Sequence, residues 1–361
     1  MTTRMFALCG LGLLSASASA QSTLTLYGVA DVYTEFLTSQ AAPGDGRAVT
    51  QTRMASGGKS GSRWGLKGKE DLGGGWRAAF RLESGINLNN GTGTGSGGGG
   101  FDRSAWVALE NDQWGMLRLG RQYTTLFDVM EKYSPTGAYS TLYEPAGAIV
   151  GLNFRENSVV KYRFETGPLA VQAHYALGGT PGTFQTSAAY GAGFDYASGP
   201  LSFAAAYDNV NGSQLSNVTH FRRYSAAAMV ALGRAEWIVG LTEGNGNVST
   251  PLVVTRYTFL WTGVRYRISE RLQAICAFYY ENVRAQNPSP GQPAPQLTNP
   301  QQVTVQLNYF PSKTTTLYLA AGYAHRAALD FDNYNYSFLH YSLAAGRSVS
   351  TGVALGIRKL F

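Results

Sequence analysis

Residues 62–88 read SRWGLKGKEDLGGGWRAAFRLESGINL and contain two runs of alternating side chains around a short glycine-rich turn. In the first run, Arg63 and Lys67 occupy positions that alternate with Trp64 and Leu66. The second run repeats this division between charged and apolar positions: Arg77, Arg81 and Glu83 alternate with Trp76, Phe80 and Leu82. Successive side chains of a β-strand point to opposite faces of the sheet. The stretch therefore predicts an antiparallel hairpin with one charged face and one apolar face.

The same alternation recurs along the whole chain. We count sixteen such runs, from LTLYGVADVYTEFL (24–37) to SVSTGVALGIRKLF (348–361). Turns such as TGPL and ASGPL alternate with long connections, which are 38–61, 89–102, 123–154, 178–186, 211–220, 285–300 and 327–347. Short turns at one end and long loops at the other are typical of up-and-down membrane barrels, whereas a β-sandwich predicts no such alternation. We therefore predict an all-β fold, a 16-stranded antiparallel transmembrane β-barrel.

The charged face of each strand is expected to line the interior of this barrel. Charged residues make up only 14% of the chain, and a lysine or arginine facing lipid at mid-depth costs about 2–4 kcal/mol. A charged interior holds water. The formal net charge is +7, and it becomes +6 without Arg4, with 28 basic against 22 acidic residues. By itself, this excess is compatible with anionic solutes, anionic lipid or nucleic acid as partners.

Residues 1–20 have the features of an export signal. Arg4 precedes the apolar run MFALCGLGLL, and Ala18-Ser19-Ala20 forms a cleavage site. The alternative is a buried N-terminal helix. We predict a signal peptide over 1–20 and a single barrel domain over 21–361, in which Cys276 is the remaining cysteine and an internal disulfide is impossible.

The connection 123–154 differs from an ordinary solvated loop. It carries many apolar and aromatic side chains: Leu126, Phe127, Met130, Tyr133, Tyr139, Leu142 and Tyr143. Loops longer than about 15 residues are usually functional or disordered, and this composition argues against disorder. We predict that it packs inward and narrows the lumen, so that its acids Asp128, Glu131 and Glu144 face the arginines of the wall. The alternative is an external loop that covers the barrel or contacts a neighbouring subunit.

Motifs of enzymes are weak in this sequence. The glycine-rich run GTGTGSGGGG (91–100) lacks the Gly-Lys-Ser/Thr of a phosphate-binding loop. The four histidines lie in separate segments. A hydrolase with a dispersed Ser/His pair remains an alternative, because catalytic triads assemble across the sequence. We predict no catalytic residue, no cofactor, no metal site and no nucleic-acid partner.

Several of these stretches resemble one known family, the general diffusion porins of Gram-negative outer membranes, especially the neisserial and Burkholderia-type branch. The matching stretches are LTLYGVAD, SRWGLKGKEDLGGGWRAAFRLESG, RENSVVKY (155–162) and the terminal GIRKLF. The resemblance implies sixteen strands, a homotrimer and a third loop folded into the channel as a constriction. It also implies passive diffusion of small hydrophilic solutes and ions, with a preference for anions.

The resemblance and the charged face together give a predicted site. The basic wall of the constriction would comprise Arg63, Lys67, Arg77, Arg81, Arg103, Arg121 and Arg155. Arg103 shares the outward-facing positions of its strand, so it would reach the lumen only at a bulge or at the rim. The resemblance further implies that Phe361 is a signal for the barrel-assembly machinery. The other expected partners are outer-membrane lipid and lipopolysaccharide.

Overall fold

The computed structural model describes residues 23–95, 99–137, 142–151, 154–212, 219–247, 254–288, 291, 296–334 and 340–361. The predicted signal peptide, residues 96–98 of the glycine-rich run and Tyr139 lie outside these ranges.

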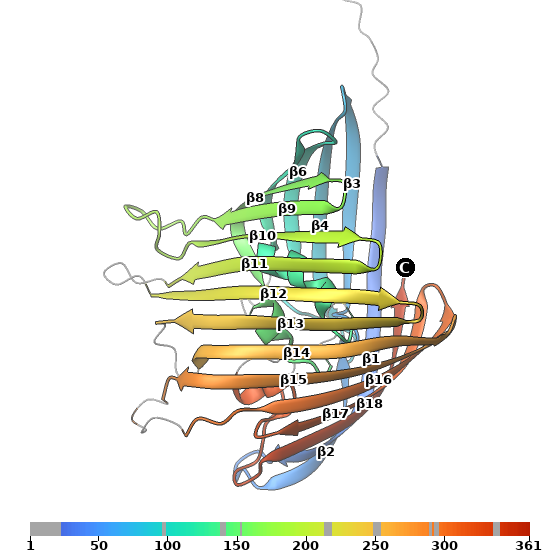
Figure 1. Cartoon of the computed structure of the whole chain (residues 1–361), viewed down its shortest axis with the longest axis vertical. Helices are drawn as coiled ribbons and strands as arrows, with labels where there is room; N and C mark the ends of the chain where they lie inside the picture. The colour runs from blue at the N-terminus through green and yellow to red at the C-terminus, as the bar shows by residue number, and fades with distance from the viewer. Residues whose placement is uncertain are drawn as a thin grey trace, which may run out of the picture.

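Long antiparallel strands make up most of the described chain (Figure 1). The strands are β1 (Thr23–Ala41), β2 (Ala48–Ser56), β3 (Arg63–Gly73), β4 (Trp76–Asn87), β5 (Thr92–Gly93), β6 (Ser104–Asn111), β7 (Gly115–Tyr123), β8 (Arg155–Thr166), β9 (Leu169–Ala176), β10 (Ala189–Ser198), β11 (Leu201–Asn211), β12 (His220–Leu232), β13 (Ala235–Gly246), β14 (Val254–Ser269), β15 (Leu272–Gln286), β16 (Gln301–Ser312), β17 (Thr315–His325) and β18 (Val349–Leu360). The described helical segments are α1 (Thr125–Met130), η1 (Glu131–Tyr133), α2 (Ala146–Val150) and η2 (Leu329–Tyr334). None of these helices has the length and apolar composition needed to cross a membrane.

The sheet is closed. Strands that follow one another pair antiparallel, and β1 pairs with β18 to complete the ring. β2 and β3 lie end to end along the other edge of β1, so they act as one wall strand interrupted at 57–62. β5 has two residues and, among the described strands, pairs with β4 alone. The eighteen strands of the described sheet thus form sixteen wall strands, which confirms the predicted fold.

The connection predicted over 38–61 is wrong for most of its length. β1 continues to Ala41, and β2 occupies Ala48–Ser56. The break at 57–62 is held by a buried carboxylate of β1, because Asp31 Oδ2 accepts hydrogen bonds from the backbone N–H groups of Lys59 (3.0 Å) and Ser60 (2.8 Å). A side chain 28 residues earlier in the sequence therefore determines this local structure.

The last residue contributes to closure of the barrel. The backbone of Phe361 exchanges two hydrogen bonds with Gly28 of β1, at 2.9 and 3.2 Å. Its ring lies over Gly28, where a Cβ atom would come within 2.2 Å of Phe361 Cζ. A residue without a side chain is therefore required at position 28.

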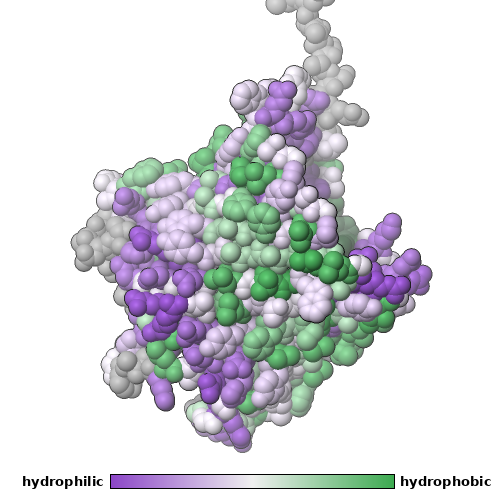
Figure 2. All heavy atoms as spheres, viewed as in Figure 1, coloured by the Kyte–Doolittle hydropathy of each residue, from purple (hydrophilic) through white to green (hydrophobic). Residues whose placement is uncertain are grey.

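The two ends and the two faces of the barrel differ as the alternation predicts. Short turns lie at one end and long loops at the other (Figure 1). Leu201 and Phe203 of β11 are exposed on the outer face, whereas Ser202 and Ala204 are buried on the inner face. Figure 2 shows an apolar band across the viewed outer face between two hydrophilic margins. Such a band flanked by polar rims matches the hydrocarbon layer of a bilayer.

Candidate functional site

A buried carboxylate on β4 gathers basic side chains on the inner face. Glu83 Oε1 accepts a hydrogen bond from Arg103 Nε (2.8 Å), and its Oε2 lies 3.5 Å from Arg63 Nε. The hydroxyl of Tyr27 donates to the same Oε2 at 2.9 Å. Arg103 reaches the lumen because it precedes Ser104, where β6 begins, so the alternation of that strand does not govern its direction.

Two tyrosines extend this arrangement. The Tyr123 hydroxyl accepts hydrogen bonds from Arg103 and from Arg155, both at 3.0 Å. The Arg155 guanidinium also lies 4.7 Å from the centre of the Tyr123 ring. On the other side of Glu83, Lys67 and Arg81 lie 5.4 and 5.6 Å from the centre of the Tyr27 ring. Cations attract aromatic faces at such distances.

We call this connected set the basic cluster: Tyr27, Arg63, Lys67, Arg81, Glu83, Arg103, Tyr123 and Arg155. It contains five of the seven basic residues predicted from the sequence. Five cations and one carboxylate give a net charge of +4. The side chains of Arg63 and Arg103 remain 23% and 12% exposed, so water and dissolved ions reach the cluster.

The other two predicted basic residues lie elsewhere. Arg77 stands next to the turn before β4 and pairs with Glu110 (2.7 Å) and with Asp112, which balance its charge. Arg121 donates to the carbonyl oxygen of Asp102 (2.7 Å) and to Asn157 Oδ1 (2.6 Å), so it ties two neighbouring segments together. Both side chains are thus held by groups outside the basic cluster.

The segment 123–154 packs against the opposite part of the inner face. α1 buries Leu126, Phe127, Val129 and Met130 in one apolar cluster with inward side chains of β11–β15: Ala204, Ala206, Phe221, Ala227, Ile238, Val254, Tyr257, Phe259, Trp261, Ala277 and Tyr279. These contacts account for the apolar residues that the sequence placed in a loop. Burial of such side chains is the main stabilising contribution to this position of the segment.

Polar anchors extend the same packing toward β18. Trp261 Nε1 donates to the carbonyl oxygen of Tyr133 (2.9 Å), and Arg265 Nε donates to that of Pro135 (3.0 Å). The Tyr143 side chain sits against Gly322 and Gly352, where added Cβ atoms would come within 2.8 Å of its Cγ and 2.5 Å of its hydroxyl oxygen. The described part of 123–154 thus follows the inner face from β9 to β18. Its two ends also touch the basic cluster, because Phe127 stacks on Tyr123 with ring centres 4.0 Å apart and the Phe154 ring lies 4.4 Å from the Arg155 guanidinium.

The loop acids occupy three different environments. Glu144 is fully enclosed and accepts hydrogen bonds from Ser134 Oγ (2.6 Å), Thr136 Oγ1 (2.7 Å) and the Tyr279 hydroxyl (2.8 Å). Burial raises the pKa of the Glu144 carboxyl, against the effect of these donors. Its carboxylate therefore does not face the arginines of the wall. Glu131 begins η1 and is partly exposed.

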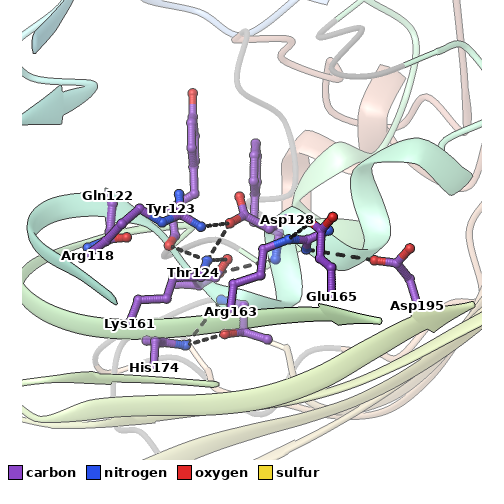
Figure 3. Close-up of polar contacts among 12 residues, drawn as sticks. Arg118, Gln122, Tyr123, Thr124, Asp128, Lys161, Arg163, Glu165, His174 and Asp195 are labelled. Atoms are coloured by element: carbon purple, nitrogen blue, oxygen red, sulfur yellow. Dashed lines mark hydrogen bonds and ion pairs between the residues drawn. The ribbon is translucent and has the colours of Figure 1, made fainter. Parts of the chain in front are cut away.

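Asp128 meets basic residues of the wall (Figure 3). Its Oδ2 accepts from the Lys161 ammonium of β8 and lies 3.5 Å from Arg118 Nη2 of β7. Lys161 Nζ also donates to the carbonyl oxygens of Tyr123 (3.2 Å) and Thr124 (3.1 Å). The ammonium therefore joins the first residues of the segment to the wall.

Other contacts between inward-folded segments and the wall were not predicted from the sequence. Lys132 of η1 pairs with Asp195 of β10. Arg163 lies 3.9 Å from the same carboxylate (Figure 3). The last long connection also folds inward, because Leu329 and Phe331 of η2 are fully buried and Phe331 packs edge-on to Phe259 at 6.2 Å. Apolar residues in the connection 327–347 were the available sequence signal for this second inward segment.

The barrel is closed and has sixteen wall strands, with a loop packed against one part of its inner face and the basic cluster on another part. This is the architecture of an outer-membrane pore protein. The chain belongs to the Gram-negative porin family, whose model matches residues 6–328. This membership places the protein in the Gram-negative outer membrane.

Individual relatives agree with the family. An outer membrane porin protein of Bordetella pertussis is 29% identical over 222 residues, which cover 55% of this chain and 57% of the relative. Outer membrane porin protein 32 of Delftia acidovorans is 37% identical over 128 residues, 35% of this chain and 34% of the relative. The matches thus span about half and about a third of these two curated relatives.

Solved structures show the same fold. The anion-selective porin from Comamonas acidovorans aligns with a TM-score of 0.75 and 21% identity, covering 94% of this chain and 100% of that one. The outer membrane protein OmpT of Vibrio cholerae aligns with a TM-score of 0.67 and 14% identity, covering 94% and 98%.

Proposed function

We propose that this protein forms a water-filled channel for passive diffusion of small hydrophilic solutes and ions, with a preference for anions and without catalysis. The observation that carries this proposal is the basic cluster, which has a net charge of +4 on the inner face of the barrel and keeps Arg63 and Arg103 partly exposed. Arginine stays protonated at physiological pH, and charged rings in a pore with low-dielectric walls select ions by sign. The porin of Comamonas acidovorans, whose fold this barrel shares, is described as anion-selective, which is in line with this preference.

We further propose that the segment 123–154 is the constriction of this channel and that residues 1–20 are a removed signal peptide. In this proposal, the wall residues of the constriction are the cations of the basic cluster, while Asp128 and Lys161 fix the loop. Arg77, Arg121 and Glu144 have structural contacts that leave them out of the selecting charge.

The assembled protein is proposed to be a homotrimer in contact with outer-membrane lipid and lipopolysaccharide, inserted by the barrel-assembly machinery through its C-terminal strand. The outer membrane protein OmpT of Vibrio cholerae, which has the same fold, has a solved structure described as its trimer form. Electrophoresis before and after boiling in detergent tests this assembly. A trimer-sized band that disappears on boiling supports it, whereas a single band of monomer size in both samples contradicts it.

Swelling of liposomes that contain the purified protein tests diffusion. We expect swelling in neutral sugars to fall steadily with solute size and to show no saturation with concentration. A saturable rate for one sugar or acid would instead indicate a substrate-specific channel. Hydrolysis of ester or phospholipid substrates that is lost on substituting one serine or histidine would contradict a channel without catalysis.

A further inference from the structure

The outer face of β8–β13 carries a shallow apolar groove of about 820 Å³. Small side chains face one another across neighbouring strands to form its floor: Ala173 opposite Ala192, and Ala205 opposite Ala226. Larger side chains form its sides: Tyr162, Phe194, Tyr224 and Leu241. These two alanine pairs lie on neighbouring rows, beside Tyr207 and Phe194, and they lower the surface there, so the groove can accept an extended hydrocarbon chain.

The groove begins at a row of tyrosines near the end of the barrel that carries the long loops. Tyr175, Tyr190, Tyr207 and Tyr224 follow one another on neighbouring strands, with ring centres 6.1, 6.2 and 5.1 Å apart. Aromatic girdles mark the boundary between hydrocarbon and headgroups in membrane barrels. From this row, the groove extends into the apolar band that Figure 2 shows on the same face.

Arginines lie directly on the loop side of the tyrosine row. Arg222 precedes Tyr224 by two positions on the outer face of β12, and Asn245 of β13 pairs with both Arg222 and Arg256. Both arginines are exposed, and neither forms a salt bridge within the described residues. Arg284 lies beside them and is paired with Glu243 at 3.1 Å. Three arginines and one carboxylate leave a net charge of +2 at headgroup depth.

We propose that the groove and these arginines bind one phosphate-bearing, multiply acylated lipid. An acyl chain lies over the alanine floor, and a headgroup phosphate contacts Arg222 and Arg256. The planar guanidinium suits bidentate recognition of phosphate, and the register of both arginines with Asn245 places them in one row, on the strands at either side of β13. The inference rests on the proposed contact of the assembled protein with outer-membrane lipid and lipopolysaccharide, and it assigns to that lipid a specific position on the barrel.

Binding of diphosphoryl and monophosphoryl lipid A to delipidated protein in detergent, measured by native mass spectrometry, tests this site. We expect the diphosphoryl lipid to bind more tightly. The double variant Arg222→Gln/Arg256→Gln should bind it about 30-fold more weakly, from the contribution of each basic side chain near an anionic lipid surface. Filling the groove with Ala192→Leu/Ala205→Leu should weaken both lipids, and millimolar inorganic phosphate should not displace either one.

The matched control removes two arginines from turns at the other end of the barrel, Arg234→Gln/Arg271→Gln, and should bind like the parent protein. The inference is overturned if Arg222→Gln/Arg256→Gln binds normally, if the control loses as much affinity, or if Tyr224→Cys forms a disulfide between subunits, which would make the groove a subunit contact. Channel conductance of the same preparations separates the two proposals. Lost lipid preference with normal conductance overturns only the lipid site, whereas absent conductance in the parent protein overturns the channel.

Discussion

Replacing Lys161 by methionine should release the beginning of the segment 123–154 from the wall. The Lys161 ammonium is fully buried and binds Asp128 together with two backbone carbonyl oxygens. Removing one partner of a buried ion pair costs about 3–5 kcal/mol. Asp128 is 20% exposed and keeps Arg118 at 3.5 Å, so we expect the lower end of this range, about 3 kcal/mol.

Hydrogen exchange measures this local opening directly. A loss of about 3 kcal/mol should accelerate exchange of the amides of α1 and η1 on the order of 100-fold, while amides of the wall strands keep their rates. The double variant Lys161→Met/Asp128→Leu removes both charges, and its exchange should return to within about tenfold of the parent, because a buried pair is often replaceable by apolar residues. Unchanged exchange in Lys161→Met would refute the anchoring role. Equal acceleration in the double variant would show that the pair itself is not responsible.

Two further predictions concern closure and pH. Gly28→Leu should reduce the yield of heat-labile assembled protein on electrophoresis, because the new side chain would overlap the Phe361 ring. Deletion of Phe361 should also reduce this yield, because it removes both closing hydrogen bonds. Normal yields in both variants would show that closure does not depend on this contact. Burial raises the pKa of Glu144 above its ordinary 4.5. Between 4.5 and the raised pKa, the Glu144 carboxyl is therefore protonated in the folded loop and ionised in the released loop. Protection of the α2 amides from hydrogen exchange should increase as pH falls through the raised pKa and level off below 4.5. Glu144→Gln should abolish this dependence, and a variant that retains it would assign the effect to another group.

The wall of the barrel was predictable because its signal is local. Two-residue alternation and the alternating lengths of connections are properties of contiguous sequence, and they give the strand count and the division between faces. The extension of β1 and the presence of β2 were not predictable from contiguous sequence, because Asp31 of β1 holds the interruption at 57–62 through tertiary hydrogen bonds.

The candidate site was predictable in residue type more than in arrangement. Alternation identified Arg63, Lys67 and Arg81, and the family resemblance added Arg103 and Arg155. The connection of these residues through Glu83 and Tyr123 depends on strands distant in the sequence. Glu144 illustrates the limit most clearly, since its donor Tyr279 lies 135 positions away. A carboxylate in a loop gives no sequence signal that distinguishes a buried anchor from a charge that faces water.

The central claim is that the basic cluster gives the channel its preference for anions. The reversal potential of single channels in a potassium chloride gradient tests this claim most directly. The parent protein should show the sign expected for chloride preference. Arg103→Gln/Arg155→Gln, which removes two of five cations, should move the reversal potential toward zero, while Arg77→Gln, whose charge Glu110 and Asp112 already balance, should leave it nearly unchanged. A cation-selective parent channel, or an equal shift in Arg77→Gln, would contradict the claim.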